Sequence, residues 1–121
     1  MSNIQLYNGD CNDLLEQMIQ NNVQVDMVLT SPPYDDIKNY NNTHAWTFEA
    51  FKRVANNLVK SLKDGGVIIW VVADKTDKGS ESGTSFKQAL YFKELGLNIH
   101  DTMIYRKLKV LLNNFVEKQH L

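Results

Sequence analysis

Cysteine is nearly absent from this sequence, and that scarcity excludes several kinds of protein. Cys11 is the only cysteine among 121 residues, so no disulfide can form within the chain. A zinc site would need histidines and carboxylates instead, but the three histidines, His44, His100 and His120, have no metal-ligand spacing. We therefore expect neither a disulfide framework nor a bound metal.

The sequence also lacks a surplus of positive charge and a long apolar run. Lys and Arg number 13 and Asp and Glu number 14, which gives a formal net charge of −1. Free-standing DNA-binding modules are usually basic, because phosphate contacts supply most of their non-specific affinity. No segment has the pattern of a signal peptide or the length needed to cross a membrane. We expect a cytoplasmic protein without a membrane partner. If it binds DNA, the positive charge that contacts the phosphates lies in a local patch or outside this chain.

What the sequence does contain is an alternation of strand-like and helix-like segments. Apolar runs predict strands over residues 4–8, 25–30, 67–73 and 97–105. Between them, apolar residues at helical spacing follow three capping residues: Asp13 with Glu16 three positions on, Thr47, and Ser85 with Gln88 three positions on. This order predicts an α/β fold with a mostly parallel sheet and flanking helices, and such sheets bind ligands at the carboxyl ends of their strands.

The most informative segment is Ser31-Pro32-Pro33-Tyr34, which directly follows the predicted strand 25–30. Proline cannot continue a strand ladder, so the two prolines end the strand in a stiff turn. Three further pieces stand in order around it: Tyr7-Asn8-Gly9-Asp10, Asp64-Gly65-Gly66 and Gly83-Thr84-Ser85-Phe86-Lys87. Over roughly residues 4–107, the chain resembles the DNA methyltransferases that modify exocyclic amino groups, whose catalytic tetrapeptide is Asp/Asn/Ser-Pro-Pro-aromatic.

The resemblance implies a partial Rossmann-like fold of the S-adenosylmethionine-dependent methyltransferases, with residues 1–107 as the catalytic portion. Residues 108–121 form a divergent tail, in which apolar residues at helical spacing predict a helix. The implied reaction is site-specific DNA methylation, as in restriction-modification: a methyl group passes from S-adenosylmethionine to the exocyclic amine of a flipped cytosine (N4) or adenine (N6) in double-stranded DNA. Serine at the first position of the tetrapeptide favours cytosine, but the serine form also occurs with adenine targets, so both bases stay open.

The tetrapeptide suits this reaction because an exocyclic amine is a poor nucleophile, its lone pair being delocalised into the ring. The Ser31 hydroxyl oxygen and the Pro32 carbonyl can accept the two amine hydrogens and localise the lone pair, while Pro32 and Pro33 keep both acceptors in place. Tyr34 offers a face for the flipped base, and such stacking is worth about 1–3 kcal/mol per base, which offsets much of the cost of flipping. The predicted catalytic residues are therefore Ser31, Pro32, Pro33 and Tyr34, and the reaction needs no metal.

Three other residues each have two interpretations. In the family, the acidic residue after the first strand, here Asp10, accepts a hydrogen bond from the adenine amino group of the cofactor, and a helix-capping role is equally open. Trp46 would either contact nucleic acid or fold back on the helix that follows Thr47 as a hydrophobic staple, and we favour the staple. Asp74 would either line the site or belong to a solvated loop, and the loop is the more ordinary interpretation.

One expected element of the family is missing, the glycine-rich loop that holds most of the cofactor. None of the six glycines forms a Phe-x-Gly-x-Gly motif or an equivalent. In the family sheet, the strand of that loop and its neighbour lie between the strands that correspond to residues 4–8 and 25–30, so we expect these two strands either to pair directly or to leave an open sheet edge. Open edges recruit partners, here a second copy of the chain or a complementary chain. We expect a truncated N-terminal half that is inactive by itself, and the alternative is a non-catalytic remnant or a subunit completed by a second chain.

Overall fold

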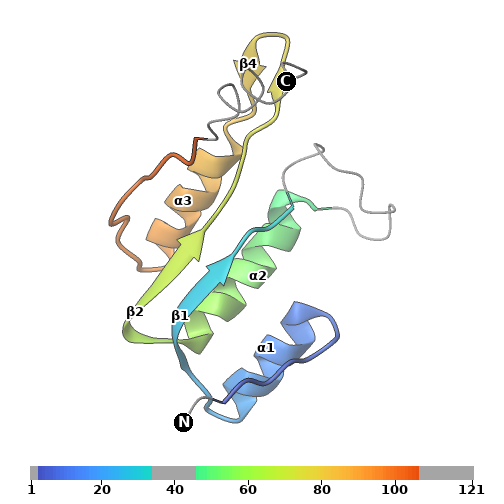
Figure 1. Ribbon diagram of the computed structural model, residues 1–121, viewed down its shortest axis with the longest axis vertical. Helices are drawn as coiled ribbons and strands as arrows, with labels where there is room; N and C mark the ends of the chain where they lie inside the picture. Colours follow the sequence, from blue (N-terminus) through green and yellow to red (C-terminus); the bar gives the residue numbers. More distant parts are fainter. Residues whose placement is uncertain (1–2, 34–45, 107–121) are drawn as a thin grey trace, which may run out of the picture.

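The computed structural model describes residues 3–33 and 46–106, and its centre is a pair of parallel strands. Strands β1 (Val25–Thr30) and β2 (Leu62–Trp70) lie beside three helices, α1 (Cys11–Gln20), α2 (Phe48–Ser61) and α3 (Thr84–Glu94) (Figure 1). The mixed α/β class, the parallel sheet and the flanking helices are confirmed. No helix in the described ranges is long and apolar enough to span a membrane.

The start of β2 is irregular because two glycines bulge out of the ladder. Val25 pairs with Leu62 but Met27 pairs with Val67, so the segment between Leu62 and Val67 is longer than its partner segment. Gly65 has φ +82°, and a Cβ on Gly66 would lie 2.9 Å from the Asp26 carbonyl oxygen. Helix α2 already ends at Ser61, so both glycines lie inside β2 and do not end that helix.

The hydrophobic core lies between the sheet and the helices α2 and α3. Phe51, Ala55 and Phe92 are its buried centre, and Ile68 and Trp70 pack against them from β2. The Trp70 indole Nε1–H donates to Gln88 Oε1 at 2.9 Å, which pairs the polar edge of a largely apolar ring with the almost fully buried Gln88 side chain. Edge-to-face contacts between Phe51 and the rings around it give this core a specific geometry.

The opposite face of the sheet is not covered by any of the described elements. Met27 pairs with Val67 and Leu29 with Ile69, and all four side chains are exposed, between 38% and 64%. Parallel strands are usually buried on both faces of their sheet. In the structure only the face toward the helices is packed, so the sheet has one apolar face turned to solvent.

Two predicted strands are absent from the part of the chain that the structure describes. Residues 4–8 form no strand, and neither do residues 97–105. Their apolar side chains are largely exposed, with Leu6 at 92% and Ile104 at 90%. A strand needs a neighbouring backbone for its hydrogen bonds, and neither segment pairs with β1 or β2. The prediction of four strands was wrong for this reason.

Two of the three predicted helix starts also differ. Asp10 caps α1, so Asp13 lies inside the first turn, and Gly83 with φ +76° precedes α3, so Ser85 lies inside that helix. Thr47 caps α2 as predicted, through Ala50 N–H donating to Thr47 Oγ1 at 3.1 Å. The predicted loop after β2 contains a small antiparallel hairpin, β3 (Thr76–Asp77) and β4 (Ser80–Glu81), which was not foreseen.

Candidate active site

The predicted catalytic segment lies directly at the carboxyl end of β1. Val71 N–H donates to the Thr30 carbonyl at 3.0 Å. The residue before Ser31 is therefore hydrogen-bonded to the residue that directly follows β2. Ser31 is exposed, Pro32 is buried and Pro33 is half-buried. The turn that follows β1 therefore leaves Ser31 exposed with a buried proline next to it. Tyr34, the fourth predicted catalytic residue, lies outside the described residues.

Asp10, the predicted cofactor residue, is the N-cap of α1. Asn12 N–H donates to Asp10 Oδ1 at 2.8 Å, which satisfies one of the free amides at the start of the helix. α1 and β1 run in opposite directions, so the capped end of α1 and the carboxyl end of β1 point the same way (Figure 1). Helix capping, one of the two roles left open for Asp10, is therefore present, and the carboxylate keeps a second oxygen with accepting capacity.

The neighbouring Cys11 is exposed, and the environment does not activate its thiol. Partial burial, and then the negative charge of Asp10, raise the pKa of Cys11 above its ordinary value of 9.0. Because the thiolate is the reactive form, a raised pKa lowers reactivity at neutral pH. Cys11 thus lacks the lowered pKa that a catalytic thiol needs.

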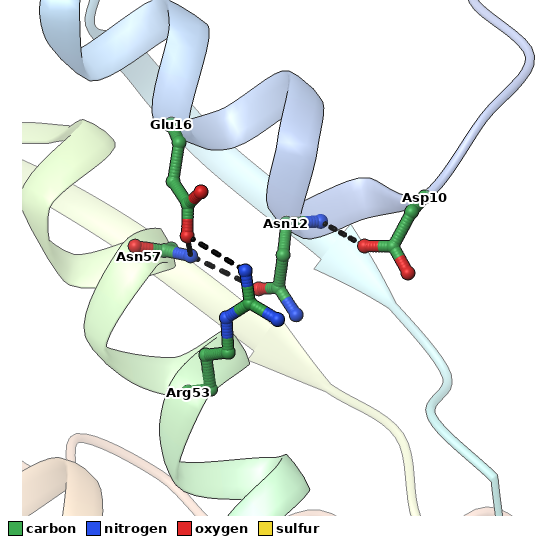
Figure 2. Close-up of polar contacts among 5 residues, drawn as sticks. All are labelled: Asp10, Asn12, Glu16, Arg53 and Asn57. Atoms are coloured by element: carbon green, nitrogen blue, oxygen red, sulfur yellow. Dashed lines mark hydrogen bonds and ion pairs between the residues drawn. The ribbon is translucent and has the colours of Figure 1, made fainter. Parts of the chain in front are cut away.

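A polar cluster joins α1 to α2 immediately behind Asp10, and sequence reasoning missed it. Asn57 Nδ2 donates to Asn12 Oδ1 at 3.0 Å and to Glu16 Oε2 at 3.3 Å (Figure 2). Arg53 Nη2 lies 3.0 Å from the same Glu16 oxygen. The hydrogen bonds from Arg53 and then Asn57 lower the pKa of Glu16, and the bond to Glu16 raises that of Arg53. The signal in the sequence was the spacing of Asn12 and Glu16, and of Arg53 and Asn57, each four residues apart and so on one helix face.

Asp74 has a defined structural role in place of the solvated loop that we considered more ordinary. Ser85 N–H donates to Asp74 Oδ1 at 2.7 Å, and the Ser85 hydroxyl donates to Asp74 Oδ2 at 2.9 Å. The carboxylate therefore caps the first turn of α3 from the segment that follows β2, where Gly83 has no side chain for the purpose. It fixes the start of α3 relative to the end of β2.

Trp46 is a hydrophobic staple, as we favoured. Its ring lies edge-on to Phe51, with ring centroids 6.4 Å apart, so the residue before the Thr47 cap packs on the fourth helical residue. Two hollows lie beside this helix start, lined by residues of α2, α3 and the segment before α2, and neither is lined by Asp10 or Ser31. Within residues 3–33 and 46–106, no group of three or more His, Cys, Asp or Glu side chains could hold a metal ion.

The geometry therefore combines an exposed serine with an adjacent proline carbonyl at a strand end and a capping aspartate at a helix start that points the same way. The family model for N6 and N4 DNA methylases matches residues 25–120, a range that contains the whole Ser31–Tyr34 segment. The chain belongs to the DNA amino-methyltransferase family. The match includes all but the last residue of the segment 108–121, which we predicted as a divergent tail.

A curated relative supports this membership. Over 83 residues, 69% of this chain, a protein named orphan methyltransferase M.BamHII from Bacillus amyloliquefaciens is 59% identical. Those residues are 30% of that protein, so the chain spans less than a third of the length of the relative that it matches. No solved structure matches this methyltransferase chain.

Proposed function

We propose that this chain is the catalytic portion of a DNA methyltransferase that transfers a methyl group from S-adenosylmethionine to the exocyclic amine of a flipped cytosine or adenine. The observation that carries the proposal is Ser31-Pro32-Pro33 at the carboxyl end of β1, inside the family match. The two strands and three helices are then a part of the Rossmann-like methyltransferase fold, and double-stranded DNA is the substrate.

In the proposed reaction, Ser31 Oγ and the Pro32 carbonyl accept the two hydrogens of the target amine. Both acceptors are held before the base arrives, because Thr30 is bonded to Val71 and Pro32 is buried. Accepting both hydrogens pulls the nitrogen toward tetrahedral geometry and directs its lone pair at the methyl group, which S-adenosylmethionine supplies when bound. Tyr34 stacks on the flipped base.

The cofactor fits this chain only in part. Asp10 can accept a hydrogen bond from the cofactor's adenine amino group, because a carboxylate has two oxygens and the α1 cap uses one of them. The chain has no glycine-rich loop for the methionine and ribose parts. Losing several hydrogen bonds to charged groups, each worth about 1.5–3 kcal/mol, lowers affinity by decades. We therefore infer that a second polypeptide segment, in the same chain or in another, completes the cofactor site.

Two measurements test the proposal: calorimetry with S-adenosylmethionine and a methyl-transfer assay on double-stranded DNA. The 121 residues alone should show neither micromolar binding nor methylation, and supplying the remaining part of a relative such as M.BamHII, fused or co-expressed, should produce both. In the completed enzyme, Ser31→Ala should lower kcat about 10²–10³-fold, as removal of one preorganised hydrogen-bond partner does elsewhere. Ser80→Ala, in the exposed hairpin, is the matched control and should leave kcat unchanged.

The alternative function is a non-catalytic remnant or a subunit that needs a second chain to complete the cofactor site, and the lack of a glycine-rich loop among these residues favours it. A completed protein that binds S-adenosylmethionine but transfers no methyl group would establish the remnant and overturn the catalytic proposal. Methylation by the 121 residues alone would instead overturn the need for a second segment.

A further inference from the structure

The polar cluster between α1 and α2 differs from an ordinary helix contact because polar atoms occupy its most buried positions. Asn12 and Asn57 are 8% and 7% exposed, and their amides bond to each other. Burying two amides costs free energy unless they are paired. Two apolar side chains would pack there without that cost. We therefore expect the polar pair to give the helix contact a structural specificity that apolar packing would not give.

What the pair contributes is one axial position of α1. Asn12 is the buried residue of that helix, while Leu15 and Ile19, three and seven positions on and so on the same helix face, are only half-buried. Half-buried apolar contacts tolerate a shift along the axis, because one aliphatic neighbour can replace another. A shift by one helical turn of about 5.4 Å would break both the Asn12–Asn57 bond and the Glu16–Arg53 ion pair, so the polar cluster selects one register.

Asn12 connects the fixed position of α1 to the Asp10 carboxylate. Its side chain accepts from Asn57, while its backbone N–H donates to Asp10 Oδ1 at 2.8 Å (Figure 2). One residue thus connects helix α2 to the carboxylate through two hydrogen bonds. Helix α2 is itself packed on the sheet through Phe51 and Ala55 in the core. The position of the Asp10 carboxylate is therefore fixed relative to the sheet and so to the end of β1.

We propose that Asn57, acting through Asn12 and supported by the Glu16–Arg53 ion pair, is a positioning residue that fixes the Asp10 carboxylate relative to the sheet edge. That the fixed carboxylate serves the cofactor rests on the proposed function. The positioning itself concerns only the 121-residue chain and is tested without cofactor or DNA, so a failure of methyl transfer and a failure of positioning are separate results.

The test follows the start of α1 in Asn57→Ala. Amide exchange of Asn12 and Leu14, whose N–H groups donate to Asp10, should become faster by about tenfold when measured by NMR, while the amides of α3 and β2 keep their protection. The pH–rate profile of Cys11 alkylation gives a second readout, since Cys11 is the only cysteine and adjoins Asp10. Its apparent pKa should fall toward the ordinary 9.0 as Cys11 becomes less buried and the Asp10 carboxylate moves away from it.

The matched control is Asn56→Ala, the neighbouring residue on α2, whose Nδ2 donates to the Tyr91 hydroxyl at 3.1 Å and not to α1. It should leave the exchange of Asn12 and the Cys11 profile unchanged. Equal effects of the two variants, or no effect of Asn57→Ala, would overturn the proposal. If Asn57→Ala unfolds the chain, Glu16→Gln is measured instead, and unchanged exchange at Asn12 in that variant overturns the supporting role of the ion pair and the proposal with it.

In the completed enzyme, Asn57→Ala should raise the KM for S-adenosylmethionine several-fold and leave kcat unchanged, because a misplaced Asp10 weakens cofactor binding in ground and transition states alike. Asn56→Ala should change neither constant. A loss of kcat with an unchanged KM would contradict a role through Asp10.

Discussion

At the scale of single residues, Asp74 shows how a charged residue in a loop can fix a helix. Both carboxylate oxygens bond to Ser85 in the first turn of α3. Asp74→Ala removes both acceptors and should lower the free energy of unfolding by about 1–2 kcal/mol, measured by urea denaturation. Asp77→Ala, in the exposed hairpin, should have almost no effect, and a comparable loss in both variants would show that the cap is not the cause.

Glu16 should make the stability of the chain depend on pH. Hydrogen bonds from Arg53 and then Asn57 lower the folded-state pKa of Glu16 below its ordinary 4.5. A depressed folded-state pKa contributes stability that is present above the unfolded pKa and disappears as the pH falls through the folded one. The urea midpoint should therefore fall as the pH is lowered from about 6 to about 3, which is the range of this titration. The fall should be smaller in Glu16→Gln than in the wild type. Equal drops in the two proteins would contradict the assignment.

The sequence predicted residues well where a local rule applied and poorly where the partner was distant. The Thr47 cap and the Trp46 staple follow from neighbours within five positions, and both are confirmed. The Asn12–Asn57 bond joins residues 45 positions apart, and the four-residue spacing within each helix indicates a polar face but not the partner that it meets. Asp10 and Asp13 both fit the start of a helix locally, and the structure shows that the earlier one is the cap.

At the scale of elements, predictions succeeded where a segment finds its partner within the described chain. Strand β1 pairs with β2, and helices α2 and α3 pack against β2, so their periodic patterns became the expected elements. Residues 4–8 and 97–105 have the pattern of strands, but no described backbone pairs with them. Pattern indicates what a segment could form, and pairing determines whether it does.

These two segments should therefore lack protection from amide exchange in the isolated chain. Residues 4–8 and 98–105 should exchange within the dead time of a manual NMR experiment, while the amides of β2 that bond to β1 remain slow. Leu97 is excepted because its N–H donates to the Phe92 carbonyl at 3.1 Å. When the completing polypeptide is present, both segments should become protected. Slow exchange in the isolated chain would show that they already pair.

At the scale of the whole molecule, the structure is a sheet with helices on one face and an apolar surface on the other. The relative M.BamHII is more than three times the length of the matched region, so most of that protein lies outside what this chain contains. Among the described residues, the uncovered sheet face is consistent with the proposal that further polypeptide, in the same chain or in another, packs on the sheet and completes the cofactor site.

The exposed apolar face of the sheet, formed by Met27, Leu29, Val67 and Ile69, should make the isolated chain self-associate. Contiguous exposed apolar surface on a sheet favours burial against another molecule. Leu29 is 64% exposed there, and its register partner Ile69 faces the same way. Leu29→Lys should shift the sedimentation equilibrium toward monomer and reduce binding of a hydrophobic dye, with little change in unfolding free energy.

Val28→Lys, one residue earlier and on the helix-facing side of β1, is the contrasting variant. It should destabilise the fold, because it places an unpaired charge against the core. Dye binding and association that stay unchanged in Leu29→Lys would show that another surface is responsible.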